Sequence, residues 1–174
     1  MDSAATTIRT ATSADAEQIA DVHVRAWQWA YRDQVPDTFL ASLSVADRTH
    51  AWQRWLDDPE RSCIWVAEAE EWIVGFVSAG RCRDEDAEPG TGEVYAIYIE
   101  ADRLGTGLGR RLFETATRWL RTNPFSCATL WVLDSNNRAR AFYEKAGWVP
   151  DGATKVDDRD GFSLHEVRYR IVFG

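Results

Sequence analysis

Three glycines within five residues form the segment of this sequence best suited to holding a ligand. They occur in Gly105-Thr106-Gly107-Leu108-Gly109, directly before Arg110. Alternating apolar residues predict a strand over 92–99, and apolar residues at helical spacing predict a helix over 108–120. A glycine turn between a strand and a helix can aim several backbone N–H groups, and the positive end of the helix dipole, at one phosphate. The same turn could also be a tight connection that binds nothing.

Two common phosphate-binding motifs do not match this turn. A P-loop needs a Lys followed by Ser or Thr after the glycines, and neither pair is present. A dinucleotide fingerprint needs a third glycine at the position of Arg110 and an acidic residue about 20 positions later, and 119–124 contain none. The glycines alone therefore indicate a phosphate without identifying the ligand.

A second motif follows an apolar strand predicted over 127–133. It reads Asn136-x-x-Ala139-x-x-Phe142-Tyr143-x-x-x-Gly147-Trp148. Spacings of three and four residues put Asn136, Ala139 and Tyr143 on one helix face, along roughly 10 Å of the axis. A phenol with a pKa near 10 is protonated at neutral pH and can act as a proton donor. Phe142 and Tyr143 could instead serve only to pack the helix on a sheet.

The two motifs, in this order and about 30 residues apart, resemble those of the GNAT superfamily, the Gcn5-related N-acetyltransferases. The resemblance covers roughly 8–174, and its specific part is 93–148. One position departs from the pattern, because the family usually has Gln or Arg where this chain has Leu104. The fold implied is α/β (α+β), with a mixed central sheet of six to seven strands, flanking helices and a splayed acetyl-CoA site. We expect one such domain over 1–174.

The resemblance also implies how acetyl-CoA would be held. Main-chain groups of Ile97, Tyr98 and Ile99 would pair with the pantetheine amides as an added strand would. Asn136 would contact the pantetheine arm, Ala139 would permit close approach, and Tyr143 would protonate the departing sulfur. The pyrophosphate would lie against Leu104, Gly105, Thr106, Gly107, Leu108, Gly109 and Arg110.

The residues that would handle the acceptor are less sharply indicated. Glu93 stands where some family members carry a glutamate that deprotonates the amine through water. A carboxylate with a pKa near 4 is a poor base unless burial raises that pKa, so Glu93 could also be a solvent-facing strand end or attract an ammonium group. Tyr95 could share the acceptor pocket. Trp27 and Tyr31, in the helical region that lines this pocket in the family, could form an apolar or cation-binding wall or belong to the core.

The remaining elements follow from local patterns. We predict a strand over 7–11, helices over 13–31, 36–43 and 44–56, a hairpin over 63–80 and a last strand over 163–172. Two charged segments, 84–92 and 152–162, are predicted to be loops. The first is acidic and contains Pro and Gly, so we expect it to be mobile and too polar to pack.

Composition narrows the partners. The chain has 28 acidic and 20 basic residues and a net charge of −8, which disfavours nucleic acid and mildly favours a cationic acceptor, or serves solubility alone. Apolar runs are too short for a membrane span. Cys63, Cys82 and Cys127 are odd in number and scattered, which argues against a disulfide framework and a zinc site. The N-terminal residues also lack the apolar core of a secretory signal peptide, and together these features predict a cytoplasmic protein.

The sequence thus predicts an acetyl-CoA-dependent N-acetyltransferase that needs no metal and acts on a small cationic amine. Two alternatives stay open. One is acetylation of a protein N-terminus or lysine, which would need an open peptide groove. The other is a non-catalytic acyl-CoA-binding regulatory module, which would have no turnover to lose. A homodimer is expected from analogy with the family.

Overall fold

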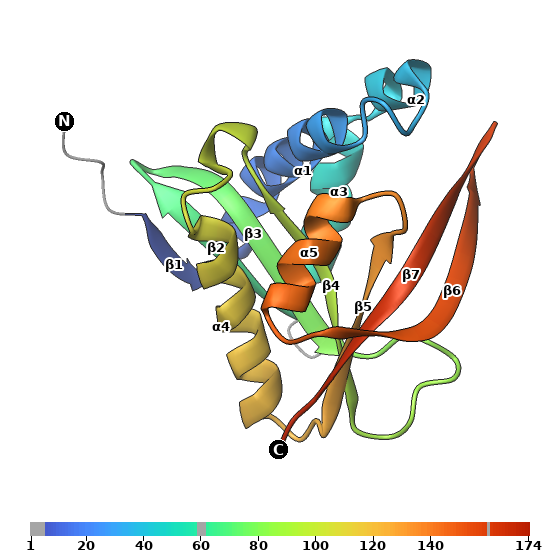
Figure 1. The fold of residues 1–174 in the computed structure, drawn as a ribbon. Helices are drawn as coiled ribbons and strands as arrows, with labels where there is room; N and C mark the ends of the chain where they lie inside the picture. The colour runs from blue at the N-terminus through green and yellow to red at the C-terminus, as the bar shows by residue number, and fades with distance from the viewer. Residues whose placement is uncertain (1–5, 59–61, 160) are drawn as a thin grey trace.

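A single sheet runs through the computed structural model, which describes residues 6–58, 62–159 and 161–174. The described residues form seven strands in the order β1-β2-β3-β4-β5-β7-β6, as Figure 1 shows. β4 and β5 pair in parallel and the other neighbours are antiparallel, which confirms the predicted mixed sheet of six to seven strands. The bounds are β1 Thr7–Thr10, β2 Ser62–Ala69, β3 Trp72–Arg81, β4 Thr91–Ile99, β5 Cys127–Leu133, β6 Val149–Arg159 and β7 Phe162–Val172.

Helices cover both faces of this sheet (Figure 1). α1 (Ala16–Ala30) and α3 (Val45–Leu56) pack on one face, and α4 (Leu108–Thr122) and α5 (Asn137–Lys145) on the other. The short α2 (Asp37–Ser42) lies at the end of α1, where Leu40 packs with Leu133 and Leu164. The larger apolar cluster lies under α4 and α5, and burial of its side chains is the main force that holds these helices to the sheet.

The sheet splits between β4 and β5. Their parallel ladder includes three residue pairs and ends at Glu93 opposite Thr129. A β-bulge in β4 lies just beyond, where Ser78 faces Ala96, Ala79 faces Val94, and Tyr95 is the extra residue. Bulges bend a strand and increase its twist. The predicted splaying of the sheet is therefore confirmed, and the edge of β4 from Val94 to Ile99 is not paired with β5.

The predicted loop over 152–162 is wrong for most of its length, because β6 extends to Arg159. β6 is the outermost strand and pairs with β7, and nearly all of its residues are exposed. An edge strand with solvent on both sides needs no alternation of apolar and polar residues, so its sequence carries no strand signal, and its charges protect the edge from pairing with other chains. Residue 160 lies outside the described residues.

The prediction that the acidic segment 84–92 would not pack is also wrong. The Asp84 carboxylate accepts hydrogen bonds from Trp131 Nε1 at 2.9 Å and from Arg168 at 3.0 Å. Asp86 accepts from the same arginine at 2.9 Å. Partners on β5 and β7 therefore compensate for the polarity of this segment.

The described residues include neither a candidate membrane-spanning helix nor a candidate metal site. In the described ranges, no helix is both long and apolar enough to cross a membrane. Across those same ranges, no three His, Cys, Asp or Glu side chains are placed to share a metal ion. Residues 1–5, on which part of the expectation about the N-terminus rests, lie outside the described residues.

Candidate active site

A cavity of about 1100 Å³ opens beside the split between β4 and β5. Most of the residues predicted to bind a ligand line it: Trp27, Tyr31, Glu93, Tyr95, Ile97, Tyr98, Ile99, Leu104, Gly105, Gly107, Gly109, Arg110, Asn136, Ala139 and Tyr143. Two do not. The Thr106 hydroxyl folds back to donate to the carbonyl of Arg103 at 2.7 Å, and Leu108 is buried in the core. The structure thus brings both sequence motifs to one cavity, while the role of each residue stays a prediction.

The glycine turn leaves room for a ligand at the start of α4. Gly105 and Gly107 have φ of +79° and +86°, which side-chain-bearing residues rarely adopt, and no atom lies within 4 Å of where a Cβ would stand. Gly107 is the N-cap of α4, so the first backbone N–H groups of that helix face this open space. Arg110 forms an exposed ion pair with Glu114 at 2.7 Å, yet it also lines the cavity. This arrangement suits an anionic group such as a phosphate.

The helix face predicted from the second motif is confirmed. Asn136, Ala139 and Tyr143 all line the cavity along α5. Asn136 also caps the helix, since its side-chain oxygen accepts the N–H of Ala139 at 3.1 Å. α5 therefore begins at the cavity, with its first turn and its phenol on the same wall.

Three buried or partly buried tyrosines, Tyr31, Tyr98 and Tyr143, line the cavity together. The Tyr98 hydroxyl accepts a hydrogen bond from Trp27 Nε1 at 2.9 Å and lies 3.4 Å from the Tyr31 hydroxyl. Burial, with the nearby Tyr98 phenol as a second cause, raises the pKa of Tyr143. Burial likewise raises the pKa of Tyr31 and Tyr98. All three phenols stay protonated at neutral pH and can donate hydrogen bonds or a proton.

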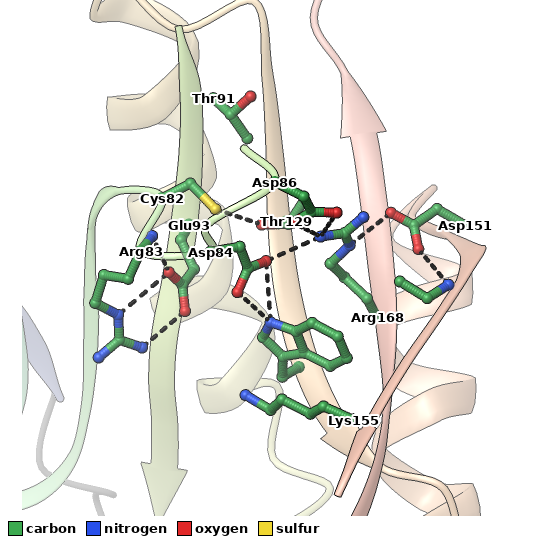
Figure 2. Close-up of polar contacts among 12 residues, drawn as sticks. Cys82, Arg83, Asp84, Asp86, Thr91, Glu93, Thr129, Asp151, Lys155 and Arg168 are labelled. Atoms are coloured by element: carbon green, nitrogen blue, oxygen red, sulfur yellow. Dashed lines mark hydrogen bonds and ion pairs between the residues drawn. The ribbon is translucent and has the colours of Figure 1, made fainter. Parts of the chain in front are cut away.

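The Glu93 carboxylate is held by Arg83, as Figure 2 shows. Arg83 donates from its side chain to both carboxylate oxygens, at 2.7 and 3.2 Å, and from its backbone N–H at 2.9 Å. Glu93 is only 3 % exposed. The Arg83 side chain is half exposed and stacks over Tyr95 at 4.0 Å. This pairing favours a structural role for Glu93, and its role as a base stays a prediction.

A second arginine, Arg168, links three carboxylates next to the cavity-lining Trp131. Arg168 on β7 lies between Asp84, Asp86 and Asp151, with N to O distances of 2.8 to 3.0 Å (Figure 2). Its side chain is only 13 % exposed. These ion pairs fix the acidic segment and β6 against β7.

Sequence reasoning missed several cavity residues. His23, Arg48 and Glu166 line the cavity, although none belongs to either motif. Burial, followed by the charge of Arg48, lowers the pKa of His23 to about 3, so this histidine is neutral. Tyr98 was predicted to contribute only its main chain, yet its hydroxyl contacts both Trp27 and the Tyr31 hydroxyl. His23 and Arg48 both fall in helices of the region predicted to line the pocket, and this was the available signal for them, whereas Glu166 had none.

Comparison with known proteins identifies the family. The sequence profile of the acetyltransferase (GNAT) family matches residues 17–148. The chain belongs to this family. A relative within it is the uncharacterized N-acetyltransferase YuaI of Bacillus subtilis (strain 168), which is 35% identical over 169 residues, or 95% of this chain and 90% of YuaI.

Solved GNAT structures show the same fold. The PaiA N-acetyltransferase of Thermoplasma acidophilum, in complex with coenzyme A, superposes with a TM-score of 0.75 at 17% identity, covering 97% of this chain and 99% of that one. YncA of Salmonella typhimurium, a putative acetyltransferase with its cofactor acetyl-CoA, gives a TM-score of 0.74 at 18% identity, covering 98% and 95%. The predicted GNAT fold is therefore confirmed.

Proposed function

We propose that this GNAT protein transfers an acetyl group from acetyl-CoA to an amine, by direct attack within a ternary complex. The observation that carries the proposal is the split between β4 and β5. The cavity beside this split is lined both by the glycine turn before α4 and by the phenol of Tyr143 on α5. A thioester arm and an amine could therefore meet in one cavity, and holding two reactants in line removes much of the entropic barrier.

Three features of the donor side support coenzyme A as its ligand. Main-chain groups of β4 from Val94 to Ile99 are not paired with β5, so they can pair with the pantetheine amides. Backbone N–H groups from Leu104 to Arg110 would hold the pyrophosphate, because two glycines there leave the space open. Asn136 and Ala139 would line the pantetheine arm along α5.

Tyr143 is the residue we assign to the leaving group. As the amine nitrogen bonds to the acetyl carbon, the carbon–sulfur bond breaks and the sulfur takes the Tyr143 proton. The raised pKa of this phenol keeps it protonated at working pH. Donation to the sulfur neutralises the negative charge that develops there as the carbon–sulfur bond breaks, and the phenolate left on Tyr143 then regains a proton from water.

Glu166 is better placed than Glu93 to take the amine proton. It lines the cavity from β7, and among the described residues it has one ion pair, to the exposed Lys155 at 3.3 Å. Burial is the main cause of the raised pKa of Tyr31 and Tyr98, and the charge of Glu166 adds to it, so this carboxylate lies near the phenols. Glu93, by contrast, has both oxygens occupied by Arg83.

The experiment that tests this function follows free-thiol release from acetyl-CoA with a panel of small amines and short peptides. We expect turnover with a small amine, and a loss of roughly 100-fold or more in kcat for Tyr143→Phe. Tyr169→Phe is the matched control, because its hydroxyl bonds Glu144 at 2.7 Å and its side chain does not line the cavity. Peptide-only turnover would favour a protein acceptor, and tight acetyl-CoA binding without turnover would favour a regulatory module.

A further inference from the structure

The cavity is electropositive although the protein is acidic. Seven arginine and lysine side chains line it, against four carboxylates, whereas the whole chain has a net charge of −8. Arg110 belongs to the first turn of α4, where the pyrophosphate of the donor would lie, and Arg138 belongs to the first turn of α5 and lies over the Trp29 ring. The other charged lining residues are the ones that an acceptor would meet.

Most of the charges on the acceptor side neutralise one another. Arg83 pairs with Glu93 at 2.7 Å, Arg159 with Asp157 at 2.6 Å, and Lys155 with Glu166 at 3.3 Å. Arg48 on α3 is different, because its guanidinium has no ion pair with any carboxylate in the ranges that the structure describes. Arg32 and Arg138 also have no ion pair in those ranges, but both lie over the Trp29 ring, whereas Arg48 lies over Trp27 beside Tyr98.

The surroundings of Arg48 make a bound anion favourable. Its guanidinium lies over the Trp27 ring at 5.7 Å, and Trp27 in turn donates to the Tyr98 hydroxyl. Trp27 is therefore the side chain that links Arg48 to Tyr98. Burial lowers the pKa of Arg48, the nearby Tyr98 phenol partly offsets this, and the like charge of Arg159 lowers the pKa further. A half-buried, unpaired cation near a second cation is unfavourable, and an anion between them would offset that cost.

His23 adds a second donor in the same place. Its Nδ1 accepts a hydrogen bond from Trp52 Nε1 at 3.3 Å, so the neutral ring carries its hydrogen on Nε2. The ring stacks on Tyr98 with centroids 4.9 Å apart, and His23 lines the cavity. Arg48 and His23 thus offer N–H groups from α3 and α1, and neither presents a negative charge.

We propose that the acceptor amine also carries a carboxylate, as an amino acid does, and that Arg48 binds this carboxylate while Glu166 receives the ammonium group. The inference rests on the proposed function. A guanidinium matches a carboxylate through two parallel hydrogen bonds, which makes arginine selective for this group. The aromatic walls from Trp27 and Trp55 suit an apolar or aromatic side chain on such an acceptor.

The test compares each amino acid with the same amine without its carboxylate. Phenylalanine is measured against phenethylamine and phenylalaninamide, and tryptophan against tryptamine. We expect the wild type to prefer the carboxylate compounds, and the ratio of kcat/KM for phenylalanine to that for phenethylamine to fall roughly 10- to 100-fold in Arg48→Gln, as loss of a charge-assisted hydrogen bond predicts. Arg48→Lys keeps the charge without the planar fork and should fall between them. Arg54→Gln, on the exposed face of the same helix, is the matched control.

The outcomes separate the inference from the proposed function. Equal use of phenylalanine and phenethylamine, or an unchanged ratio in Arg48→Gln, overturns the inference and leaves acetyl transfer standing. A preference for O-phosphoethanolamine over every carboxylate compound would also overturn it, because the bound group would then be a phosphate. If no amine is acetylated, the proposed function fails. Calorimetry of phenylalanine binding to the coenzyme A complex then decides, and equal affinity in wild type and Arg48→Gln overturns the inference.

Discussion

Arg83 holds Glu93 from two directions, with its side chain on both carboxylate oxygens and its backbone N–H on one of them. The carboxylate is buried where the β4–β5 ladder ends. A base must exchange its partner for the proton it removes, and this carboxylate would have to give up three hydrogen bonds first. The pair therefore favours a structural role, which is to fix the end of the β4–β5 ladder. The bulge at Tyr95 lies two residues beyond Glu93.

The first prediction distinguishes a structural role for Glu93 from a catalytic role for Glu166. Glu93→Gln should lower the free energy of unfolding by about 1–3 kcal/mol, because it leaves the buried site with a weaker partner for Arg83. Its loss of kcat/KM should stay well below the roughly 100-fold expected when a general base is removed, whereas Glu166→Gln should reach that loss. Urea unfolding and steady-state kinetics measure the two effects.

Lys155→Gln is the control for Glu166. It breaks the same ion pair at 3.3 Å but keeps the carboxylate, so it should cost less activity than Glu166→Gln. If Glu93→Gln is the variant that loses 100-fold while remaining as stable as the wild type, Glu93 is the base and the Arg83 pair must open during the reaction.

The second prediction concerns the hydrogen bond from Trp27 to Tyr98. Tyr98→Phe leaves the Trp27 indole N–H without its acceptor, and we expect a loss of about 1–3 kcal/mol in the free energy of unfolding. Trp27→Phe removes the donor instead. If the hydrogen bond accounts for the effect, the double variant should be about 1 kcal/mol more stable than the sum of the single losses predicts. Strictly additive losses would mean that packing, and not this bond, is responsible.

The third prediction tests the glycine turn. Gly107→Ala forces a side chain into φ of +86° and should cost roughly 1 kcal/mol of stability. Gly161 has the same φ of +86° and the same open surroundings, but it lies in the β6–β7 hairpin. Both variants should therefore lose similar stability, and only Gly107→Ala should weaken acetyl-CoA binding in calorimetry. Equal affinities in the two variants would remove the turn from the cofactor site.

Local sequence patterns were enough to find the residues that we propose for the donor side of the site. The glycine turn and the helix from Asn136 act through spacing within a few residues, and both line the cavity as expected. β6 escaped prediction because an edge strand exposed on both faces needs no periodic pattern. The packing of the acidic segment 84–92 was also missed, because its partner Arg168 is 84 positions from Asp84 in the chain.

The acceptor side could not be derived from sequence because its contacts are long-range. Trp27 and Tyr98 are 71 residues apart, and Trp52 and His23 are 29 apart, so no local pattern links them. The charge balance of the whole chain is a similarly indirect guide. A net charge of −8 mildly favours a cationic acceptor, and that expectation stays a prediction, yet most acidic residues lie outside the cavity, whose lining has more arginine and lysine than carboxylate. Local charge within a site, and not the total, determines what that site attracts.

The last prediction follows from the neutral state of His23. Burial, helped by the charge of Arg48, lowers the pKa of this ring to about 3, whereas an unfolded histidine titrates near 6.5. As pH falls below about 6.5 the unfolded chain binds a proton that the folded protein refuses, so stability is lost at up to roughly 1.4 kcal/mol per pH unit. His23→Gln keeps an acceptor for Trp52 Nε1 but cannot titrate, so its free energy of unfolding should change less between pH 6.5 and 5 than that of the wild type. Urea unfolding at pH 5, 6, 7 and 8 makes the comparison, and parallel profiles for the two proteins would show that His23 is protonated in the folded state as readily as in the unfolded one.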